Sequence, residues 1–482
     1  MRNVDKKRFK SLLLGTALAF VLFLSYLPLS AQRQDITYFL KEIPQNNSSN
    51  PAMGIGYDLY FFAFMPSFEI RTSGFGYNSF IERHEEFRDS LNINSQRFSK
   101  NMLENNFLNM QMEQNLLGFG LRKGKNEFTF SSYINVDSRV EFSNTSFDFV
   151  AMGMESIVSS MELNEKHLLN LNAYLANAIG YIHHVNKSLS VGVRAKLLFG
   201  ITNISTSDCV LRFANNEAGG YTAALGLDMK TSNLFNLLDL AAAYGLITRE
   251  DALPMSIGET LISIFHNIGL ALDFGTVYKV NNSLKLGFSV SDLGFISWNS
   301  GLKQLRTSEE ELITDFEGID TSLTKYNASI LGLANNIVSS LDEAFDVHEY
   351  EMEAYSQFLP IQLKVSGEFI LSDEHTIQAL IGTKFVNNRF IDSHLSAFYA
   401  FRSSYVGFSA GNTFMFSSWF NPSVLISLNL KPVGFYLGTS FKIGGNGGLN
   451  MGNISSLSLF GGLSLAFGED VAGKRNRVRR HW

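Results

Sequence analysis

Charged residues, cysteine and proline are all scarce in this chain. Asp, Glu, Lys and Arg make up only 17% of its 482 residues, and the chain has eight prolines and one cysteine, Cys209. A single cysteine excludes a disulfide within the chain and any metal site built from several thiolates. A water-soluble protein carries about 25% charged residues. The low charge is therefore unusual for a molecule whose whole surface meets water.

Long apolar runs are missing after the first thirty residues. The one such run, Ser11–Leu29, precedes the small residues Ser30 and Ala31 and follows five basic residues, Arg2, Lys6, Lys7, Arg8 and Lys10. This order is typical of a secretory signal peptide, so residues 1–31 are predicted to be one that is cleaved near Ala31. A retained membrane anchor is the alternative, because the run is nearly long enough to span. The small residues favour cleavage.

Alternation of apolar and polar residues dominates the rest of the chain. From Val191 to Thr202 and from Leu284 to Val290, every second residue is apolar, and apart from Leu198 the residues between are glycine, serine, threonine or charged. Period 2 places each set on one face of a sheet. These stretches run to about 10–14 residues, which is the length that a tilted membrane strand needs, whereas strands of soluble sandwiches are nearer 5–6.

The connections between these stretches alternate in length. Short turns such as Lys123–Asn126 and Lys431–Pro432 separate pairs of stretches, while loops near residues 75–109, 143–170, 230–267 and 299–359 are long. Short turns on one rim and long loops on the other are typical of outer-membrane barrels. We therefore expect an all-β fold: one transmembrane antiparallel barrel of about 14–16 strands over residues 57–467, with periplasmic short turns and extracellular long loops. A soluble secreted all-β protein is the weaker alternative.

Two long loops carry helical periodicity. Apolar residues recur every three or four positions from Ile330 to Phe345, and Leu234–Leu246 is similar. The spacing predicts amphipathic helices. They are interpreted as caps on the barrel mouth, with a ligand gate or a partner surface as the sharper alternative.

Five charged residues are expected to face the lumen, because they lie on the polar side of the alternating stretches: Arg194, Lys196, Asp273, Lys279 and Lys285. They either set charge selectivity or hold a plug by ion pairs. Alternatively, they are polar simply because a barrel interior is polar. Both interpretations stay open at this point.

Three segments carry a resemblance to known proteins. Asn50, Pro51 and Ala52, within QNNSSNPAMGIGY, resemble the N-terminal region of fatty-acid-transporter-type outer-membrane barrels. LKLGFSVSDLGFISW and FLPIQLKVSGEF resemble an uncharacterised family of large barrels found in Bacteroidota-type bacteria. The resemblance implies a plug formed by residues 32–56 inside the lumen, with Asn50, Pro51 and Ala52 as its motif. It also implies transport of a hydrophobic molecule and no catalytic residue.

Patterns that suggest chemistry do not support an enzyme, a cofactor or a metal. Gly407–Gly411 matches G-x-S-x-G, but it lies in an alternating stretch rather than on the strand-to-helix turn that a nucleophile elbow needs. His183 and His184 are adjacent, so in a strand they point to opposite faces and cannot easily share one ion. The chain is predicted to have no catalytic residue, cofactor-binding residue or metal ligand.

The distribution of charge bears on partners. The formal net charge is −6, and the last ten residues hold five basic side chains, so the acidic body argues against nucleic-acid binding. Residues 468–482 are expected to be a basic periplasmic tail. Expected partners are outer-membrane lipid, the barrel-assembly machinery, a small hydrophobic ligand and a protein that docks on the extracellular loops.

The expected function is passage or binding of a small molecule across the bacterial outer membrane. The alternative is a porin-like barrel without transport activity that scaffolds a surface or secretion complex.

Overall fold

The computed structural model describes residues 34–40, 46–54, 57–73, 81–83, 91–93, 103–145, 160–164, 168–215, 221–245, 253, 256–307, 312–314, 348–386, 389–415, 420–443 and 454–468. The expected signal peptide, the helix expected at 330–345 and the basic tail beyond residue 468 lie outside these residues. No helix among the described residues is long and apolar enough to cross a membrane.

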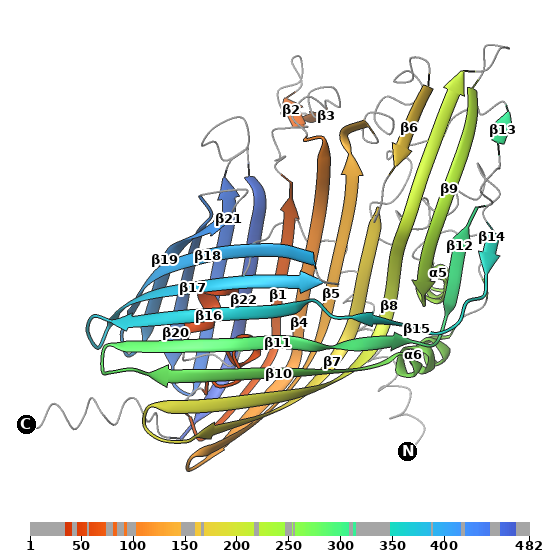
Figure 1. The fold of residues 1–482 in the computed structure, drawn as a ribbon. Coiled ribbons are helices and arrows are strands. Elements are labelled where there is room, and N and C mark those ends of the chain that lie inside the picture. The colour runs from red at the N-terminus through yellow and green to blue at the C-terminus, as the bar shows by residue number, and fades with distance from the viewer. Residues whose placement is uncertain are drawn as a thin grey trace, which may run out of the picture.

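Fourteen strands of the described chain form a closed antiparallel ring. They are β1 (Leu59–Thr72), β4 (Asn105–Lys123), β5 (Asn126–Ser143), β7 (Leu169–His184), β8 (Leu189–Asn215), β10 (Ile268–Lys279), β11 (Leu284–Trp298), β16 (Ile361–Ile370), β17 (His375–Val386), β18 (Arg389–Arg402), β19 (Val406–Met415), β20 (Pro422–Leu430), β21 (Val433–Ile443) and β22 (Ile454–Phe467). β22 pairs with β1, with Leu59 opposite Phe467, and this pairing closes the barrel. The predicted fold class and strand number are confirmed (Figure 1).

The remaining elements are short strands, helices and one hairpin. They are η1 (Gln34–Phe39), α2 (Asn46–Ser49), β2 (Ile81–Arg83), β3 (Leu91–Ile93), β6 (Ser160–Asn164), β9 (Tyr221–Ser232), α5 (Leu234–Ala243), α6 (Ile257–His266), β12 (Leu302–Arg306), β13 (Leu312–Thr314), β14 (His348–Tyr350) and β15 (Tyr355–Phe358).

The alternation of the sequence appears as an inverted pattern of burial. On β10, Leu270 and Phe274 are 58% and 45% exposed, whereas Ala271 and Asp273 are 2% and 0% exposed. The other barrel strands also carry large apolar side chains on the outer face, among them Ile381, Ile426 and Leu437. An outer face this apolar is stable only against hydrocarbon. The protein is a membrane-spanning β-barrel of the outer-membrane type.

Tight turns join the strands at one rim. Gly124 has a positive φ of 63° in the β4–β5 turn, a conformation that costs glycine nothing. The side-chain oxygens of Asn186 and Asn281 accept hydrogen bonds from backbone N–H groups two and three residues onward, which closes the next two turns. We call this end the short-turn rim.

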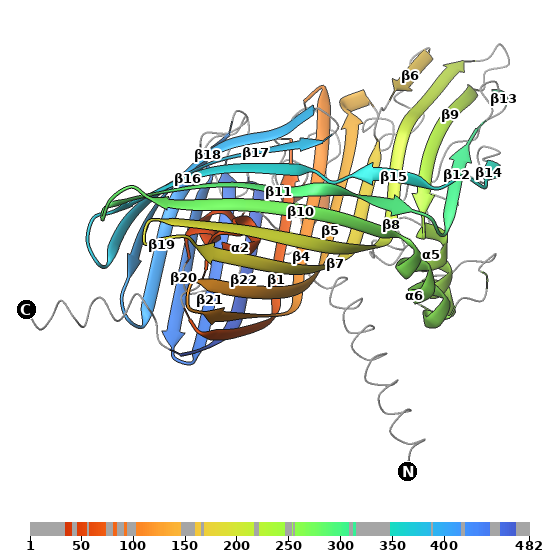
Figure 2. The same ribbon diagram turned by 60° about the horizontal axis from the view of Figure 1, so that its bottom comes forward.

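At the opposite end, β8 is much longer than the sequence predicts. Its first half pairs with β10 in the wall, and its second half, from Asn203 to Asn215, pairs with β9. β6, β12 and β13 extend this second sheet by pairing with β8 or β9. Figures 1 and 2 show it standing beyond the barrel, with α5 and α6 beside its base. We call it the projecting sheet.

The N-terminal segment lies inside the barrel (Figure 2). Ile36, Tyr38, Phe39 and Leu40 are buried against aromatic and aliphatic side chains from the wall, namely Tyr57, Tyr60, Phe62, Met65, Leu380, Phe398, Leu425, Tyr436 and Phe460. Seven strands, β16 to β22, follow between Pro360 and Phe467.

Candidate functional site in the barrel lumen

Asn50 joins the N-terminal segment to the wall, and it is completely buried. Its side-chain nitrogen donates to the hydroxyl of Tyr38 at 2.9 Å and lies 3.4 Å from the carbonyl oxygens of Thr276 and Phe288 on β10 and β11. Its side-chain oxygen accepts from the backbone N–H of Ala52 at 3.0 Å. One amide therefore shapes the Asn50–Pro51–Ala52 turn and binds it to two strands.

Glycines in three neighbouring strands make room for this turn. Gly192 on β8 lies opposite Gly275 on β10, and Gly287 follows on β11. A Cβ atom at Gly192 would overlap the Pro51 carbonyl, and one at Gly275 would overlap the Asn50 side chain. The wall therefore carries no side chains at these three positions, so the segment can approach its backbone. Glycine inside strands commonly serves such a close approach.

Polar contacts also fix η1. His394 of β18 contacts Asp35, with 2.7 Å between His394 Nε2 and Asp35 Oδ2. Arg402 donates to the carbonyl oxygen of Phe39 at 2.6 Å, and Tyr38 shares a 3.0 Å hydrogen bond with Ser366. Strands β16 and β18, with β17 between them, thus bind the seven-residue stretch 34–40 and hold it in the lumen near the short-turn rim.

A cluster of four buried charges lies next along the wall. Lys196 Nζ is 2.7 Å from Asp273 Oδ1 and 2.6 Å from Asp292 Oδ1, and Arg194 Nε is 3.7 Å from Asp273 Oδ2. Two cations and two anions compensate one another, as buried charges must. Arg194 also donates to the carbonyl oxygen of Asn47 at 3.4 Å, so the cluster touches the N-terminal segment.

Asp292 completes this cluster, although its position in the sequence does not mark it as facing the lumen. It has a positive φ of 65° and its backbone N–H donates to Asp273 at 2.8 Å. The register between β10 and β11 shifts at this point, which marks a β-bulge. A signal was present, because the apolar phase of β11 passes from Val290 to Leu293, a step of three residues instead of two.

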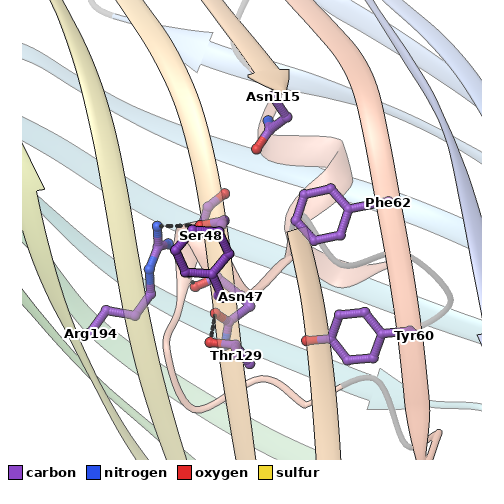
Figure 3. Close-up of a pocket in the computed structure, with 9 residues that line it drawn as sticks. Asn47, Ser48, Tyr60, Phe62, Asn115, Thr129 and Arg194 are labelled. Carbon is purple, nitrogen blue, oxygen red and sulfur yellow. Dashed lines mark hydrogen bonds between the residues drawn. The ribbon is translucent and has the colours of Figure 1, made fainter. Parts of the chain in front are cut away.

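A small cavity separates α2 from the wall. Asn47, Ser48, Tyr60, Thr129 and Arg194 line it, and Figure 3 shows these side chains converging. Its volume is about 20 Å³, which is room for about one water molecule. The described contact between segment and wall is therefore closely packed.

An apolar layer lies beyond the charges, toward the projecting sheet. It is built from five strands and contains Tyr133, Tyr174, Ala176, Ala178, Leu198, Ala271, Ile296, Trp298 and Leu359. Trp298 is fully buried, its ring covers Gly200, and its indole N–H has no hydrogen-bond partner. The polar lumen expected from alternation is correct for the charge cluster but wrong for this layer, whose side chains are aromatic, aliphatic or alanine.

One ion pair crosses the lumen. Lys384 of β17 lies 2.8 Å from Asp137 of β5, and Gln111 of β4 donates to the same carboxylate at 2.9 Å. β5 and β17 are separated by five strands in one direction around the ring and by seven in the other. The pair therefore links nearly opposite walls. We call it the cross-lumen pair.

The five charged residues selected from the sequence fall into three places. Arg194, Lys196 and Asp273 meet in the charge cluster. Lys285 pairs with Glu368 of the neighbouring strand at 3.2 Å, and Lys279 lies at the short-turn rim, where it donates to Asn282 at 3.1 Å. The sequence analysis missed Asp137, Lys384 and the Asp35–His394 pair, because period 2 assigns a face but names no partner across a lumen.

The patterns that suggest chemistry lie in ordinary barrel structure. Ser409 is in the middle of β19, paired on both sides by β18 and β20. His183 and His184 lie near the short-turn rim, with separate partners in Asn126 and Ser190. Within the described residues no group of three or more His, Cys, Asp or Glu side chains is placed to hold a metal ion.

The chain belongs to the Family of unknown function (DUF5723), whose model matches residues 51–440. The match begins at Pro51, inside the lumen, and ends on β21. It therefore includes the charge cluster, the apolar layer and the cross-lumen pair. No curated protein matches the chain.

Solved structures with a similar outline include two toluene transporters and a FadL homologue. The toluene transporter TbuX of Ralstonia pickettii has a TM-score of 0.44 and 9% identity, covering 88% of this chain and 94% of that one. The toluene transporter TodX of Pseudomonas putida has a TM-score of 0.40 and 10% identity, covering 87% and 92%. A FadL homologue of Pseudomonas aeruginosa has a TM-score of 0.36 and 10% identity, covering 88% and 91%. Likeness at this level identifies no substrate.

Proposed function

We propose that this protein passes a small hydrophobic molecule across the outer membrane through its lumen. The observation that carries the proposal is the apolar layer around Trp298, inside a barrel where the charge cluster and the cross-lumen pair are ion-paired. A water-filled porin has a polar interior. A path that offers aromatic and aliphatic surface favours an apolar solute, because such a solute loses little by leaving water there.

The described lumen is obstructed at two levels. The N-terminal segment lies across the short-turn end, and the cross-lumen pair ties the walls together farther along. Passage therefore requires both to move. The indole N–H of Trp298, buried without a partner, is a polar group that a ligand with one acceptor oxygen would satisfy.

The experiment is an uptake assay with the full chain in liposomes. Radiolabelled oleate and toluene serve as separate probes, and folding is verified by the band shift of unboiled protein on a gel. We expect uptake above that of empty liposomes for at least one probe. Leu198→Asn, in the apolar layer, should reduce it, while Phe295→Asn, on the outer face of the wall, should leave the initial rate unchanged.

Two results would contradict the proposal. One is a folded barrel that takes up neither probe and retains no lipophilic molecule through purification, as judged by mass spectrometry of a solvent extract. The other is uptake that both substitutions reduce equally, because lumen chemistry would then play no part.

A scaffold function is the second candidate, and the projecting sheet favours it. β8 and β9 stand beyond the barrel and offer a surface to a protein partner. Recovery of one stoichiometric protein with the purified barrel, lost when residues 203–232 are replaced by a short turn, would support this function.

Export and assembly complete the proposal. The signal peptide is cleaved near Ala31, the short-turn rim faces the periplasm, and the barrel-assembly machinery inserts the barrel into outer-membrane lipid. Asn50, Pro51 and Ala52 hold residues 32–56 as a plug, and Arg194, Lys196 and Asp273 receive it. The N-terminal sequence of the mature protein tests the cleavage site directly.

A further inference from the structure

Helix α6 turns its polar side toward the protein and its apolar side away from it. Thr260 and Ser263 are 4% and 7% exposed, whereas Leu261, Ile262 and Phe265 are 45%, 59% and 50% exposed. A surface helix of a protein in water has the opposite arrangement. The exposed apolar side chains lie within about 100° of the helix circumference, since successive residues are about 100° apart.

The buried side of α6 covers a polar gap in the wall. Here the strand that pairs with β8 changes. β9 ends opposite Asn203, and β10 begins opposite Phe199. Asn233 and Asn267, both fully buried, bind the carbonyl oxygens of Ile201 and Gly200 at 3.2 and 3.3 Å. Ser263 of α6 donates to Asn233 and shares a 2.7 Å hydrogen bond with Ser300.

Such a gap cannot face hydrocarbon uncovered, because unpaired backbone groups are costly there. A helix can cover the gap and leave no backbone group unpaired. Its polar side chains bond to the groups of the gap, and its own backbone N–H and C=O groups bond to one another. The capping box of Ser256 and Glu259 satisfies the first turn of α6 in the same way.

The height of α6 follows from β8. Phe265 of α6 packs edge-on against Phe199, with ring centres 5.0 Å apart. Phe199 lies ten residues from Leu189, where β8 leaves the short-turn rim. At about 3.3 Å per residue and a tilt of about 40° this is a height of about 25 Å, the thickness of the apolar band of such barrels.

We infer that α6 lies in the lipid leaflet on the projecting-sheet side, with Leu261, Ile262 and Phe265 against acyl chains. The occupant is lipid because the apolar side of α6 continues the lipid-facing wall without a break. Phe265 contacts Phe199, and Ile268 and Leu270 follow along β10 with exposed side chains. Glu259 and His266 lie on the far edge of the exposed surface, where they reach the headgroups.

The test measures lipid contact in single-cysteine variants of the full chain. Cys209→Ser removes the native thiol, and a small fluorophore is attached at Ile262→Cys, at Leu270→Cys in the wall, at Glu259→Cys, or at Asn282→Cys in a short turn. Each protein is placed in phosphatidylcholine liposomes with or without bromine on the acyl chains, and folding is verified by the gel shift.

We expect bromine to quench the label at Ile262 as strongly as at Leu270, with weaker quenching at Glu259 and the least at Asn282. Leu261→Cys is a second variant on the same face and should match Ile262. Quenching at Ile262 and Leu261 no stronger than at Asn282, with full access to iodide in water, would overturn the inference. A partner protein or a second copy would then be the occupant in the native membrane.

Discussion

Asp273 is the carboxylate that holds the two buried cations of the lumen in place. It contacts both Arg194 and Lys196 and accepts the backbone N–H of Asp292. Buried ion pairs add little net stability, but removing one partner leaves an uncompensated charge in a low-dielectric site. The energetic role of the cluster is therefore measured by removing one of its charges.

Asp273→Ala should lower the free energy of unfolding by about 3 kcal/mol, the lower end of the range for a broken buried pair, because Asp292 still partners Lys196. Urea unfolding in lipid vesicles measures it. The matched control is Glu162→Gln, which breaks the exposed Glu162–Arg212 pair and should cost about 1 kcal/mol or less. Equal costs would contradict the assignment of Asp273 as the centre of the cluster.

Gly275 is the residue on which the fit of the N-terminal segment depends most directly. Gly275→Ala places a methyl group against Asn50, so we expect residues 34–40 and 46–54 to lose protection from hydrogen exchange while β17 and β18 keep theirs. Gly367→Ala is the control, since its Cβ would lie 3.9 Å from the nearest atom, an ordinary contact. Unchanged exchange in Gly275→Ala would show that the segment binds elsewhere.

The strands show which features of the barrel can be predicted from the two-residue alternation of apolar and polar side chains. It places Leu270 outside and Asp273 inside, and so predicts the barrel, its closing strand and the faces of three clustered charges. It does not predict that Lys384 reaches Asp137, because contacts across a lumen depend on strand number, tilt and register together. Nor does it predict Asp292, whose bulge shifts the phase of one strand relative to its neighbour.

The length of β8 could not be predicted from the sequence, for a different reason. Beyond Asn203 the strand leaves the barrel wall and pairs with β9, so its faces do not have to follow the alternation of the wall. The residues from Thr206 to Cys209 are polar and carry no strong alternation. Burial against a partner strand, rather than the lipid, determines structure in that segment.

The N-terminal segment and the cross-lumen pair are separate elements, so their effects on conductance should combine. Deleting residues 34–54 should raise single-channel conductance in a planar bilayer, and adding Lys384→Met should raise it further because the walls lose their link. Adding Lys285→Met to the deletion should not, since Lys285 pairs with Glu368 on an adjacent strand. The same conductance with either substitution would mean that the cross-lumen pair does not restrict the lumen.

On the scale of the whole molecule, the outer face of the barrel determines where the protein is stable. Charge at the middle of this face should cost far more than charge at its border, because only the middle is distant from water and headgroups. Ile381 lies six residues into β17, near mid-height, whereas Leu371 lies at the short turn just before that strand; both are exposed on the outside.

Ile381→Arg should therefore destabilise the barrel by about 2–4 kcal/mol and Leu371→Arg by about 0–1 kcal/mol. Urea unfolding in vesicles measures both, followed by the band shift of the folded barrel. The two positions carry the same charge on aliphatic sites of similar exposure, so depth in the lipid is the main variable. A cost at Leu371 equal to that at Ile381 would place the hydrocarbon boundary beyond the short-turn rim, and the 25 Å height deduced for α6 would then have to be measured from a different plane.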